Sequence, residues 1–205
     1  MDRTVGPELF KLQQVRYSYP GEVDALVDIS LAVREGEHTV ILGANGSGKS
    51  TLLKLLDGLY FPQGGEAHAF GWPLTERSLE DEAFSQELHR RVGLVFQDPD
   101  VQLFSATVWD EIAFGPLQLG LPGGEVRERV EKMLEWLGLG DLRERPPYRL
   151  SGGEKRKVAL ASVLVVRPEV LLLDEPTAFL DPRSRCQILD YLLEWGEGTG
   201  TLVLC

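Results

Sequence analysis

The sequence predicts an α/β nucleotide-binding fold, and three observations carry this prediction. The apolar run Thr39 to Leu42 leads directly into the glycine-rich loop Gly43 to Thr51, which a helical pattern follows. Farther along, Val170 to Leu173 are four consecutive apolar residues, which is typical of a central parallel strand buried on both faces. Between these features, apolar residues recur at helical spacing over 125–137, which predicts a helical insert between about 100 and 165. We therefore expect a sheet that carries a phosphate-binding loop, with a helical segment inserted.

The first half of the chain predicts a β-rich arrangement around the loop, because short apolar stretches alternate with polar turns. In order, the predicted elements are strands within 9–42 broken by turns at 17–21 and 34–37, a helix over 52–56, a turn at 62–65, and strands over 66–70 and 91–96. The last of these strands ends at Gln97-Asp98-Pro99.

The second half predicts helices and then the buried strand. Residues 125–137 form an amphipathic pattern, with apolar residues at Val126, Val130, Met133, Leu134 and Leu137. Ser151 is placed to cap a further helix that runs to Val165. Val170 to Leu173 then form the strand buried on both faces.

Composition and charge limit the classes of function. A chain of 205 residues is long enough for one α/β domain with a core. The net charge of −11, from 21 basic and 32 acidic residues, disfavours a nucleic-acid partner, although a local basic patch is compatible with it. The apolar segment Val158 to Val166 is far shorter than the about 20 residues that span a bilayer. Cys186 and Cys205 give no disulfide framework, no Cys/His spacing indicates zinc, and the amino-terminal residues lack a signal-peptide pattern, so we expect a cytoplasmic location.

The loop has the spacing Gly-x4-Gly-Lys-Ser of a phosphate loop. Its glycines let successive backbone N–H groups converge on phosphates, and the following helix adds its positive end. Lys49 is expected to reach the β- and γ-phosphates, and Ser50 to offer its hydroxyl to Mg²⁺, with Thr51 one residue deeper. The competing interpretation, a glycine-rich turn without a ligand, is disfavoured by the strand before the loop and the helix after it.

Two adjacent carboxylates, Asp174 and Glu175, follow the buried strand. The carboxyl ends of parallel strands border the crevice in which α/β sheets bind ligands. We expect Asp174 in the Mg²⁺ shell and Glu175 as a general base or water-orienting group opposite the γ-phosphate. Alone, Asp-Glu-Pro could merely end a strand.

These motifs together resemble the ATP-binding cassette (ABC) ATPases over essentially the whole chain. The matching segments are Gly43 to Thr51, Gln97, Leu150-Ser151-Gly152-Gly153-Glu154, Val170 to Glu175 and Leu180-Asp181. Leu-Ser-Gly-Gly-Glu is the discriminating element, although as a bare pentapeptide it is also a capped helix start. The resemblance implies a single ABC domain over 1–205, with an amino-terminal antiparallel β subdomain and a helical signature-motif subdomain at about 100–165 inserted in the core.

The resemblance also implies the ligands, the dimer and the site residues. Each ATP would lie between the phosphate loop of one subunit and the signature Ser151, Gly152, Gly153 and Glu154 of a second subunit, identical or a paralogue. Tyr19 would stack on adenine, with Tyr17 as competitor and simple packing before Pro20 as the alternative for both. Gln97 would contact Mg²⁺ and sense a membrane partner, and Asp181 would lie at the subunit interface. The implied ATP contacts are Tyr19, Asn45, Gly46, Ser47, Gly48, Lys49, Ser50, Thr51 and Gln97, with Mg²⁺ held by Ser50, Gln97 and Asp174.

Two departures from the family pattern stand out. Phe179 occupies a position before Leu180-Asp181 where a small residue is commoner, so we expect local differences in interface packing. The sequence also stops at Thr201 to Cys205, which resembles the last core strand, just before the histidine that contacts the γ-phosphate in the family. His38, His68 and His89 lie too far upstream to replace it. The expectation is therefore a domain truncated before that histidine, which binds ATP and hydrolyses it poorly.

Residues 95–104 and 107–116 resemble the ATPases of energy-coupling factor importers, and 145–150 are closer to the cobalt or nickel branch than to the vitamin branch. This implies a transmembrane coupling subunit, a separate substrate-binding membrane protein, and a peripheral location on the cytoplasmic face of the membrane. Asp98, Asp100, Asp110 and Glu111 are expected to receive a basic helix of the coupling subunit. The alternatives are a soluble ABC module acting on nucleic acid, against which the charge weighs, and a regulatory module that closes on ATP without turnover.

Overall fold

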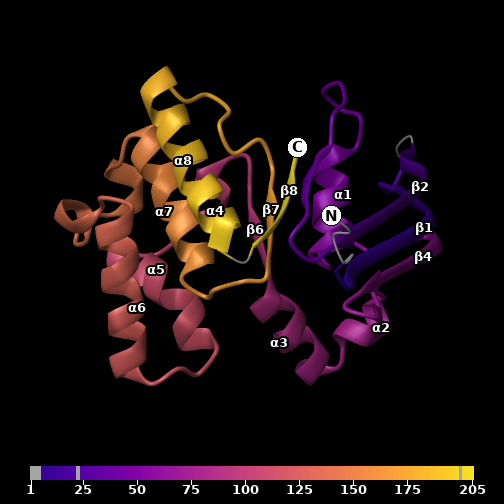
Figure 1. Ribbon diagram of the computed structural model, residues 1–205, viewed down its shortest axis with the longest axis horizontal. Coiled ribbons are helices and arrows are strands. Elements are labelled where there is room, and N and C mark those ends of the chain that lie inside the picture. Colours follow the sequence, from indigo (N-terminus) through magenta and orange to yellow (C-terminus); the bar gives the residue numbers. More distant parts are fainter. Residues whose placement is uncertain (1–5, 22–23, 199) are drawn as a thin grey trace, which may run out of the picture. The chain divides into compact units, whose positions relative to one another are not determined.

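The computed structural model describes residues 6–21, 24–198 and 200–205, which form two compact units. Among these residues, one unit comprises 6–21, 24–94, 169–174 and 200–205, and the other comprises 95–168 and 175–198. The first unit holds two four-stranded sheets and the phosphate loop, whereas the second is mainly helical (Figure 1). The predicted α/β class is thus confirmed.

The first sheet is antiparallel and has the strand order β2-β1-β4-β5. Its strands are β1 (Glu8–Ser18), β2 (Asp24–Arg34), β4 (Gly64–Ala69) and β5 (Trp72–Pro73). Phe10, Leu12 and Val15 of β1 are buried, while Lys11 and Gln13 between them are exposed. This alternation is what a strand shows when one face covers a core and the other meets solvent. The turns predicted at 17–21 and 34–37 are shorter than expected, at 20–21 and 35–36, because Tyr17 and Ser18 continue β1 and Arg34 ends β2.

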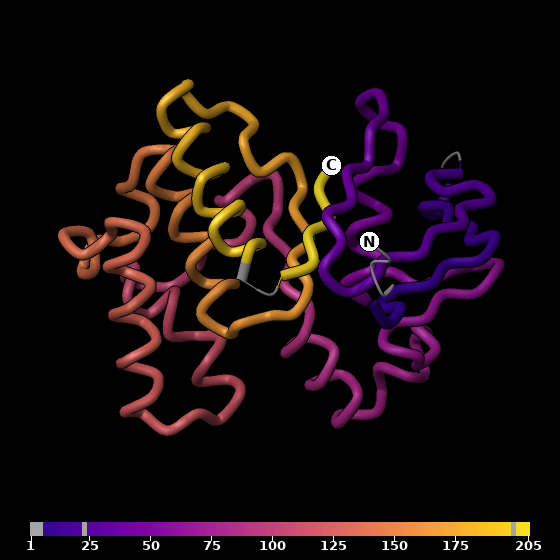
Figure 2. The backbone as a smooth tube through the Cα atoms, in the orientation of Figure 1, coloured from indigo at the N-terminus to yellow at the C-terminus, as the bar shows by residue number. Residues whose placement is uncertain are grey.

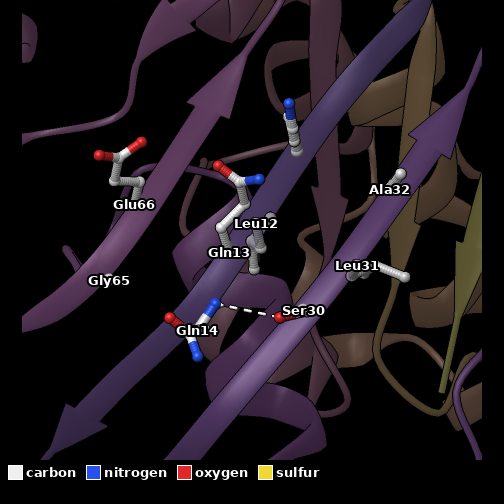
Figure 3. A pocket seen from close by; sticks show the side chains of 9 residues that line it. Leu12, Gln13, Gln14, Ser30, Leu31, Ala32, Gly65 and Glu66 are labelled. Carbon is white, nitrogen blue, oxygen red and sulfur yellow. Dashed lines mark hydrogen bonds between the residues drawn. The ribbon is translucent and has the colours of Figure 1, made fainter.

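A bulge in β1 shapes the outer face of this sheet. The pairing register shifts between Leu12 and Val15, and Gln14 takes a left-handed φ of 51° while its amide donates to Ser30 Oγ at 3.0 Å (Figure 3). Residues Gln13, Ser30 and Glu66 border a polar hollow of about 860 Å³ beside this bulge. None of the predicted nucleotide-binding residues lines this hollow.

The second sheet supports the phosphate loop and has the order β3-β8-β7-β6. Its strands are β3 (His38–Val40), β8 (Thr201–Leu204), β7 (Val170–Leu173) and β6 (Val92–Val95). Strand β8 pairs in parallel with both β3 and β7, so residues far apart in sequence lie side by side (Figure 2). All four residues of β7 are buried, which confirms the predicted central strand. Strand β3 ends at Val40, before the end of the apolar run 39–42. Beyond it, the Ile41 amide adds one more hydrogen bond to β8, which it donates to Leu204 O at 2.8 Å.

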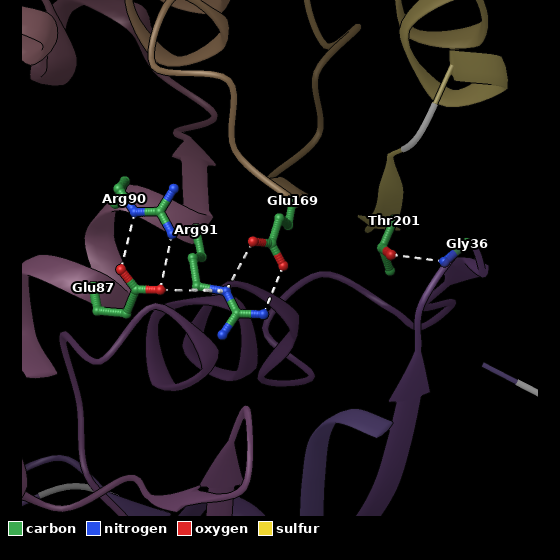
Figure 4. A network of polar contacts seen from close by, with 6 residues as sticks. All are labelled: Gly36, Glu87, Arg90, Arg91, Glu169 and Thr201. Carbon is green, nitrogen blue, oxygen red and sulfur yellow. Dashed lines mark hydrogen bonds and ion pairs between the residues drawn. The ribbon is translucent and has the colours of Figure 1, made fainter. Parts of the chain in front are cut away.

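Polar contacts tie together the amino ends of these parallel strands. Arg91, before β6, forms a two-pronged pair with Glu169, before β7, at 3.0 and 2.6 Å (Figure 4). The Glu169 carbonyl accepts the amide of Thr201 at 3.0 Å, and Thr201 Oγ1 accepts the amide of Gly36 at 2.9 Å. Arg91 also lies over the Phe70 ring at 3.6 Å. This edge of the sheet is thus occupied by structural contacts, which leaves the carboxyl ends for ligands.

The helices of the first unit follow the loop and the antiparallel sheet. They are α1 (Lys49–Leu56), α2 (Glu76–Leu79) and α3 (Glu82–Arg91). Helix α1 begins inside the phosphate loop and buries Leu52, Leu53, Leu55 and Leu56, in agreement with the helical pattern predicted after the loop. This packing fixes the helix end that faces the expected phosphates.

The second unit contains the predicted helical segment. Its helices are α4 (Pro99–Gln102), α5 (Val108–Gln118), α6 (Gly123–Trp136), α7 (Gly152–Leu164) and α8 (Pro182–Gly198), with 3₁₀ turns at Gly140–Leu142 and Pro147–Arg149. Val126, Val130 and Leu134 of α6 are buried, which confirms the predicted amphipathic face. Across the part of the chain that is described, no helix is long and apolar enough to cross a membrane.

Candidate functional site

The phosphate loop owes its shape to two glycines in left-handed conformations. Gly46 has φ +78° and Gly48 has φ +89°. A Cβ on Gly48 would lie 2.2 Å from the carbonyl oxygen of Ala25 in β2, whereas a Cβ on Gly46 would meet nothing within 4 Å. Position 48 therefore favours glycine for two reasons: the backbone is left-handed there, and the antiparallel sheet approaches too closely for a Cβ atom.

Lys49 and Ser50 present their polar atoms at the start of α1. Lys49 Nζ donates to the carbonyl oxygens of Gly43 at 3.2 Å and Ala44 at 3.1 Å, which holds the ammonium group over the loop. Ser50 Oγ donates to Asp174 Oδ1 at 2.9 Å. Ser50 and Asp174 are separated by 124 positions in sequence, so the fold joins two motifs that the sequence predicted independently.

The Ser50–Asp174 pair fits a magnesium site that the phosphates complete. Hydroxyl and carboxylate oxygens are ligands that Mg²⁺ prefers, and this ion usually takes few protein ligands and several from substrate phosphates and water. Asp174 is 6 % exposed, and Oδ1 also accepts from Cys205 Sγ at 3.1 Å. Within the described ranges, no group of three or more His, Cys, Asp or Glu side chains could hold a metal by itself. The donor set thus suits an ion that arrives with a nucleotide.

Three tyrosines cluster beside the phosphate loop. Tyr19 Oη lies 3.0 Å from Thr51 Oγ1, and its ring meets those of Tyr17 and Tyr60 at nearly right angles, 88° and 89°. Tyr17 stacks in parallel on Tyr60, with centroids 4.9 Å apart. Burial raises the pKa of Tyr17 and of Tyr60. The structure therefore places both predicted adenine candidates together, and adds Tyr60, which no local pattern links to residue 17.

Gln97 and Glu175 meet in the second unit. Gln97 Nε2 donates to Glu175 Oε2 at 2.8 Å, although the two residues are 78 positions apart. Glu175 has φ 43°, a left-handed conformation that is uncommon for a residue with a side chain and is often found at functional sites. A carboxylate that accepts an amide hydrogen bond keeps a defined orientation, which a general base requires.

The signature segment forms a capped helix start. Ser151 Oγ accepts from the Glu154 amide at 3.4 Å, and Glu154 Oε2 accepts from the Ser151 amide at 2.7 Å, so a capping box begins α7. The hydrogen bonds that the Glu154 carboxylate accepts from the amide and the hydroxyl of Ser151 lower the pKa of Glu154. The two glycines differ in their surroundings, because a Cβ on Gly152 would meet nothing within 4 Å, whereas one on Gly153 would lie 2.8 Å from Ser184 Oγ. Gly152 thus leaves the helix end open, and Gly153 permits close packing on α8.

Asp181 caps α8, and Phe179 lies nearby on the surface. The Asp181 carboxylate accepts from Ser184 Oγ at 2.5 Å and from the amides of Arg183 at 3.0 Å and Ser184 at 3.1 Å. The Ser184 bonds lower the pKa of Asp181. Phe179 is 94 % exposed and has φ 60°, which is costly for a bulky side chain. An exposed aromatic side chain therefore stands at the position where ABC ATPases more commonly have a small residue.

Within each unit, several of the predicted residues come together. Tyr19, Lys49, Ser50, Thr51 and Asp174 lie in the first unit, and the signature, Gln97, Glu175 and Asp181 lie in the second. In the second unit, a hollow of about 540 Å³ is bordered by Gln97, Gly152, Lys155, Arg156 and Phe179. Three segments that the sequence analysis identified separately thus border one hollow.

The predicted acidic docking cluster needs a correction. Glu111 is 3 % exposed, and its Oε2 accepts the amides of Phe104 at 2.9 Å and Ser105 at 2.7 Å, so it cannot receive a basic helix. A buried carboxylate is stabilised by such backbone donors, and here it orders the turn before α5. Asp98 caps α4, and Asp100 pairs with Lys155 at 2.5 Å.

What the sequence analysis missed is an apolar patch on this surface. Its members are large apolar side chains that stay exposed on α4, α5 and the turn between them: Val101, Phe104, Phe114 and Leu117. Phe104 and Phe114 meet edge to face, with centroids 5.0 Å apart. These apolar residues lie in the same two segments as the acidic ones, but the sequence alone does not show which of them stay exposed.

Comparison with known proteins places these features in one family. A family model described as ABC transporter matches residues 26–178. The nickel import ATP-binding protein NikO of Rhodobacter capsulatus is 59 % identical over 175 residues, covering 85 % of this chain and 68 % of that protein.

Two solved structures are similar in fold. CbiO1 of Clostridium perfringens, described as part of the ABC transporter complex CbiONQ, has a TM-score of 0.81 at 38 % identity and covers 96 % of this chain and 77 % of its own. The ATP-binding cassette MJ0796, solved as a dimer in a post-hydrolysis state with ADP and Pi, has a TM-score of 0.83 at 28 % identity, covering 96 % of this chain and 87 % of its own.

Proposed function

This chain belongs to the ABC transporter family, and from that premise we propose that it is the ATPase subunit of an importer of the energy-coupling factor type that takes up nickel or cobalt. The observation that carries the ATP-binding role is the hydrogen bond of 2.9 Å between Ser50 and Asp174. It joins the phosphate loop to the end of the buried strand in the arrangement that a bound magnesium nucleotide needs. The relative that imports nickel supports the choice of substrate class.

The site residues divide the chemistry between binding and activation. Lys49 is placed to pair with the β- and γ-phosphates, and Tyr19, which makes no parallel ring contact within the tyrosine cluster, to stack on adenine. Ser50 and Asp174, with Gln97, would hold Mg²⁺, which neutralises charge that develops on the phosphates during transfer. Glu175, oriented by Gln97, accepts a proton from the attacking water. Asn45, Gly46 and Ser47 contribute backbone N–H groups to the phosphates.

The signature segment acts on the nucleotide of a second subunit. The open end of α7 at Gly152 offers N–H groups and the positive end of the helix dipole, which suits a γ-phosphate presented by another molecule. The Ser151 hydroxyl donates to Glu154 Oε2 at 2.8 Å. By rotating away from this carboxylate, it would offer a further donor to the γ-phosphate. Asp181 and the exposed Phe179 would lie at the interface between the two subunits. The dimeric structure of a related cassette supports this arrangement.

Mixing two inactive variants tests the ATPase and the dimer together. Lys49→Ala removes the phosphate contact of one subunit, and Ser151→Arg blocks the signature that it offers to its partner. Each variant alone is expected to lose about 100-fold or more in ATP hydrolysis. A mixture should recover hydrolysis, because half of the sites in mixed dimers combine an intact loop with an intact signature. Lack of recovery, with a parent chain that hydrolyses ATP, would contradict the intermolecular site. A parent chain that does not hydrolyse ATP would contradict the proposed function.

The apolar patch Val101, Phe104, Phe114 and Leu117 is the surface we assign to the transmembrane coupling subunit, with Asp110 at its edge. Aromatic pairs that stay exposed on a single chain are typical centres of interfaces. Docking there would hold the ATPase on the cytoplasmic face of the membrane. The separate substrate-binding protein, rather than this chain, would select the metal.

Replacing Phe104 and Phe114 with serine should reduce co-purification with the coupling subunit by about tenfold or more, because the centre of the interface is lost. ATP binding should be unchanged. Trp72→Ser is the matched control, since Trp72 is also an exposed aromatic, 63 % accessible, but lies in the first unit. Equal co-purification of the double variant and the parent would reject this docking surface.

Glu111→Ala should lower the free energy of unfolding by about 2 kcal/mol, because the amides of Phe104 and Ser105 lose their buried acceptor. Urea unfolding of this variant beside the parent measures the effect.

A further inference from the structure

Arg156 is a buried arginine in the second turn of α7 that the proposed roles leave unexplained. Its exposure is 3 %. Nη1 donates to the carbonyl oxygen of Phe96 at 2.7 Å, and Nη2 donates to the carbonyl oxygen of Gln97. One guanidinium group thus binds two consecutive carbonyl groups of the segment that follows β6.

The same segment is attached to α7 at two more points. Gln102 Oε1 accepts the Phe96 amide at 3.2 Å, while its Nε2 donates to Ala159 O at 2.9 Å. Lys155 Nζ pairs with Asp100 Oδ1 at 2.5 Å. Hydrogen bonds on both sides of Gln97 therefore join residues 96–102 to the signature helix.

The arginine contact differs from the other two in what it fixes. A planar guanidinium group with a fork of donors sets the direction of both carbonyl groups at once, which a flexible ammonium group does not do. The Phe96 carbonyl lies in the peptide plane before the Gln97 Cα and the Gln97 carbonyl in the plane after it. Fixing both planes sets the direction in which the Gln97 side chain leaves the backbone. That side chain ends 2.8 Å from Glu175 Oε2.

We propose that Arg156 is a positioning residue for ATP hydrolysis, which sets the orientation of Gln97 and, through it, of Glu175. This role rests on the proposed function, because it requires Glu175 to act on the attacking water. It also links the signature helix, which contacts the nucleotide of the partner, to the candidate base of its own subunit. Arg156 thereby makes the position of the base depend on the position of that helix.

Steady-state kinetics of Arg156→Met test this role. We expect kcat for ATP to fall about tenfold, because small misplacements of a catalytic group are costly, and KM to change by less than about threefold. ATP-dependent dimerisation, measured in a Glu175→Gln background, should be unchanged. In a Gln97→Ala background, Arg156→Met should change kcat by less than about twofold, because a residue that acts through Gln97 has nothing left to orient.

Arg129→Met is the matched control. Arg129 also binds two carbonyl groups of this unit, those of Val165 at 3.3 Å and Val166 at 3.4 Å, but at the opposite end of α7. Its kcat should stay within about twofold of the parent, and its effect should be the same with or without Gln97. If Arg156→Met does not fold, Arg156→Lys decides, with an expected loss of about threefold because the charge stays and the fork is lost.

Any one of three results would overturn the positioning role alone. The first is an unchanged kcat in folded Arg156→Met, or in Arg156→Lys if only that variant folds. The second is an equal loss of kcat in Arg129→Met, and the third is a full additional loss when Arg156→Met is added to Gln97→Ala. A parent chain without ATP hydrolysis would instead overturn the proposed function, and this role with it. The rate of the parent chain therefore separates the two failures.

Discussion

Glu175→Gln is expected to reduce ATP hydrolysis by about 100-fold or more, because glutamine cannot accept the proton of the attacking water. The substitution keeps the size of the side chain, and Gln97 can still contact its oxygen. ATP binding should therefore persist. The variant should accumulate as an ATP-bound dimer, which the parent chain forms only transiently because it hydrolyses the ATP. Hydrolysis and size-exclusion chromatography of the same samples, with and without ATP, measure both effects.

The control for this experiment is Glu135→Gln, a change of the same kind at an exposed position on α6. It should behave as the parent in both assays. Hydrolysis by Glu175→Gln at the rate of the parent would contradict the assigned role. If neither chain hydrolyses ATP but both form dimers, the regulatory interpretation, closure without turnover, replaces that of a transport motor.

Gly48→Ala should damage the phosphate loop more than any other single methyl group added to it. The added Cβ would need a left-handed backbone and would lie 2.2 Å from the Ala25 carbonyl oxygen, a contact with backbone that cannot move aside easily. Strain and overpacking together should lower the free energy of unfolding by about 3 kcal/mol. Nucleotide affinity should fall about 100-fold, because the same shift displaces the amides that bind phosphate. Urea unfolding and titration with a fluorescent ATP analogue measure these effects.

Gly46→Ala separates the two causes. Gly46 has a similar φ of +78°, but its added Cβ would meet nothing within 4 Å. It should therefore lose only about 1 kcal/mol, the cost of the left-handed conformation. Equal destabilisation by both variants would mean that the contact with β2 does not constrain the loop.

Sequence reasoning succeeded where the chemistry of the site is local. Three features each depend on fewer than ten consecutive residues: the phosphate loop, the buried strand β7 and the cap of α7. Each of them forms where it was predicted. Gly48, Ser151 and Val170 to Leu173 have local reasons for their identity, namely backbone angle, capping and burial. The roles of the individual site residues remain predictions that the experiments above address.

Features that depend on distant partners were not predictable. Glu111 resembled its acidic neighbours in sequence, and only the fold turns it inward to the amides of Phe104 and Ser105. Arg156 sits in a helix of mixed polarity, and nothing local marks it as the residue that binds the carbonyl groups of Phe96 and Gln97. Tyr60 joins Tyr17 only because α1 returns the chain to the first sheet. In each case the partner is chosen by tertiary structure.

The pairing of β3 with β8 has a consequence for biosynthesis. Strand β3, which leads into the phosphate loop, gains its parallel neighbour only when residues 201–204 are available, more than 160 positions later, as shown by the pairing of His38 with Leu202. Contacts of such long sequence separation form late, since a large loop must close first. During synthesis from the amino terminus, the ribosome therefore releases the glycine-rich loop long before its supporting sheet can be completed. Nucleotide could therefore stabilise this sheet in the nascent chain only after residues 201–204 have been synthesised.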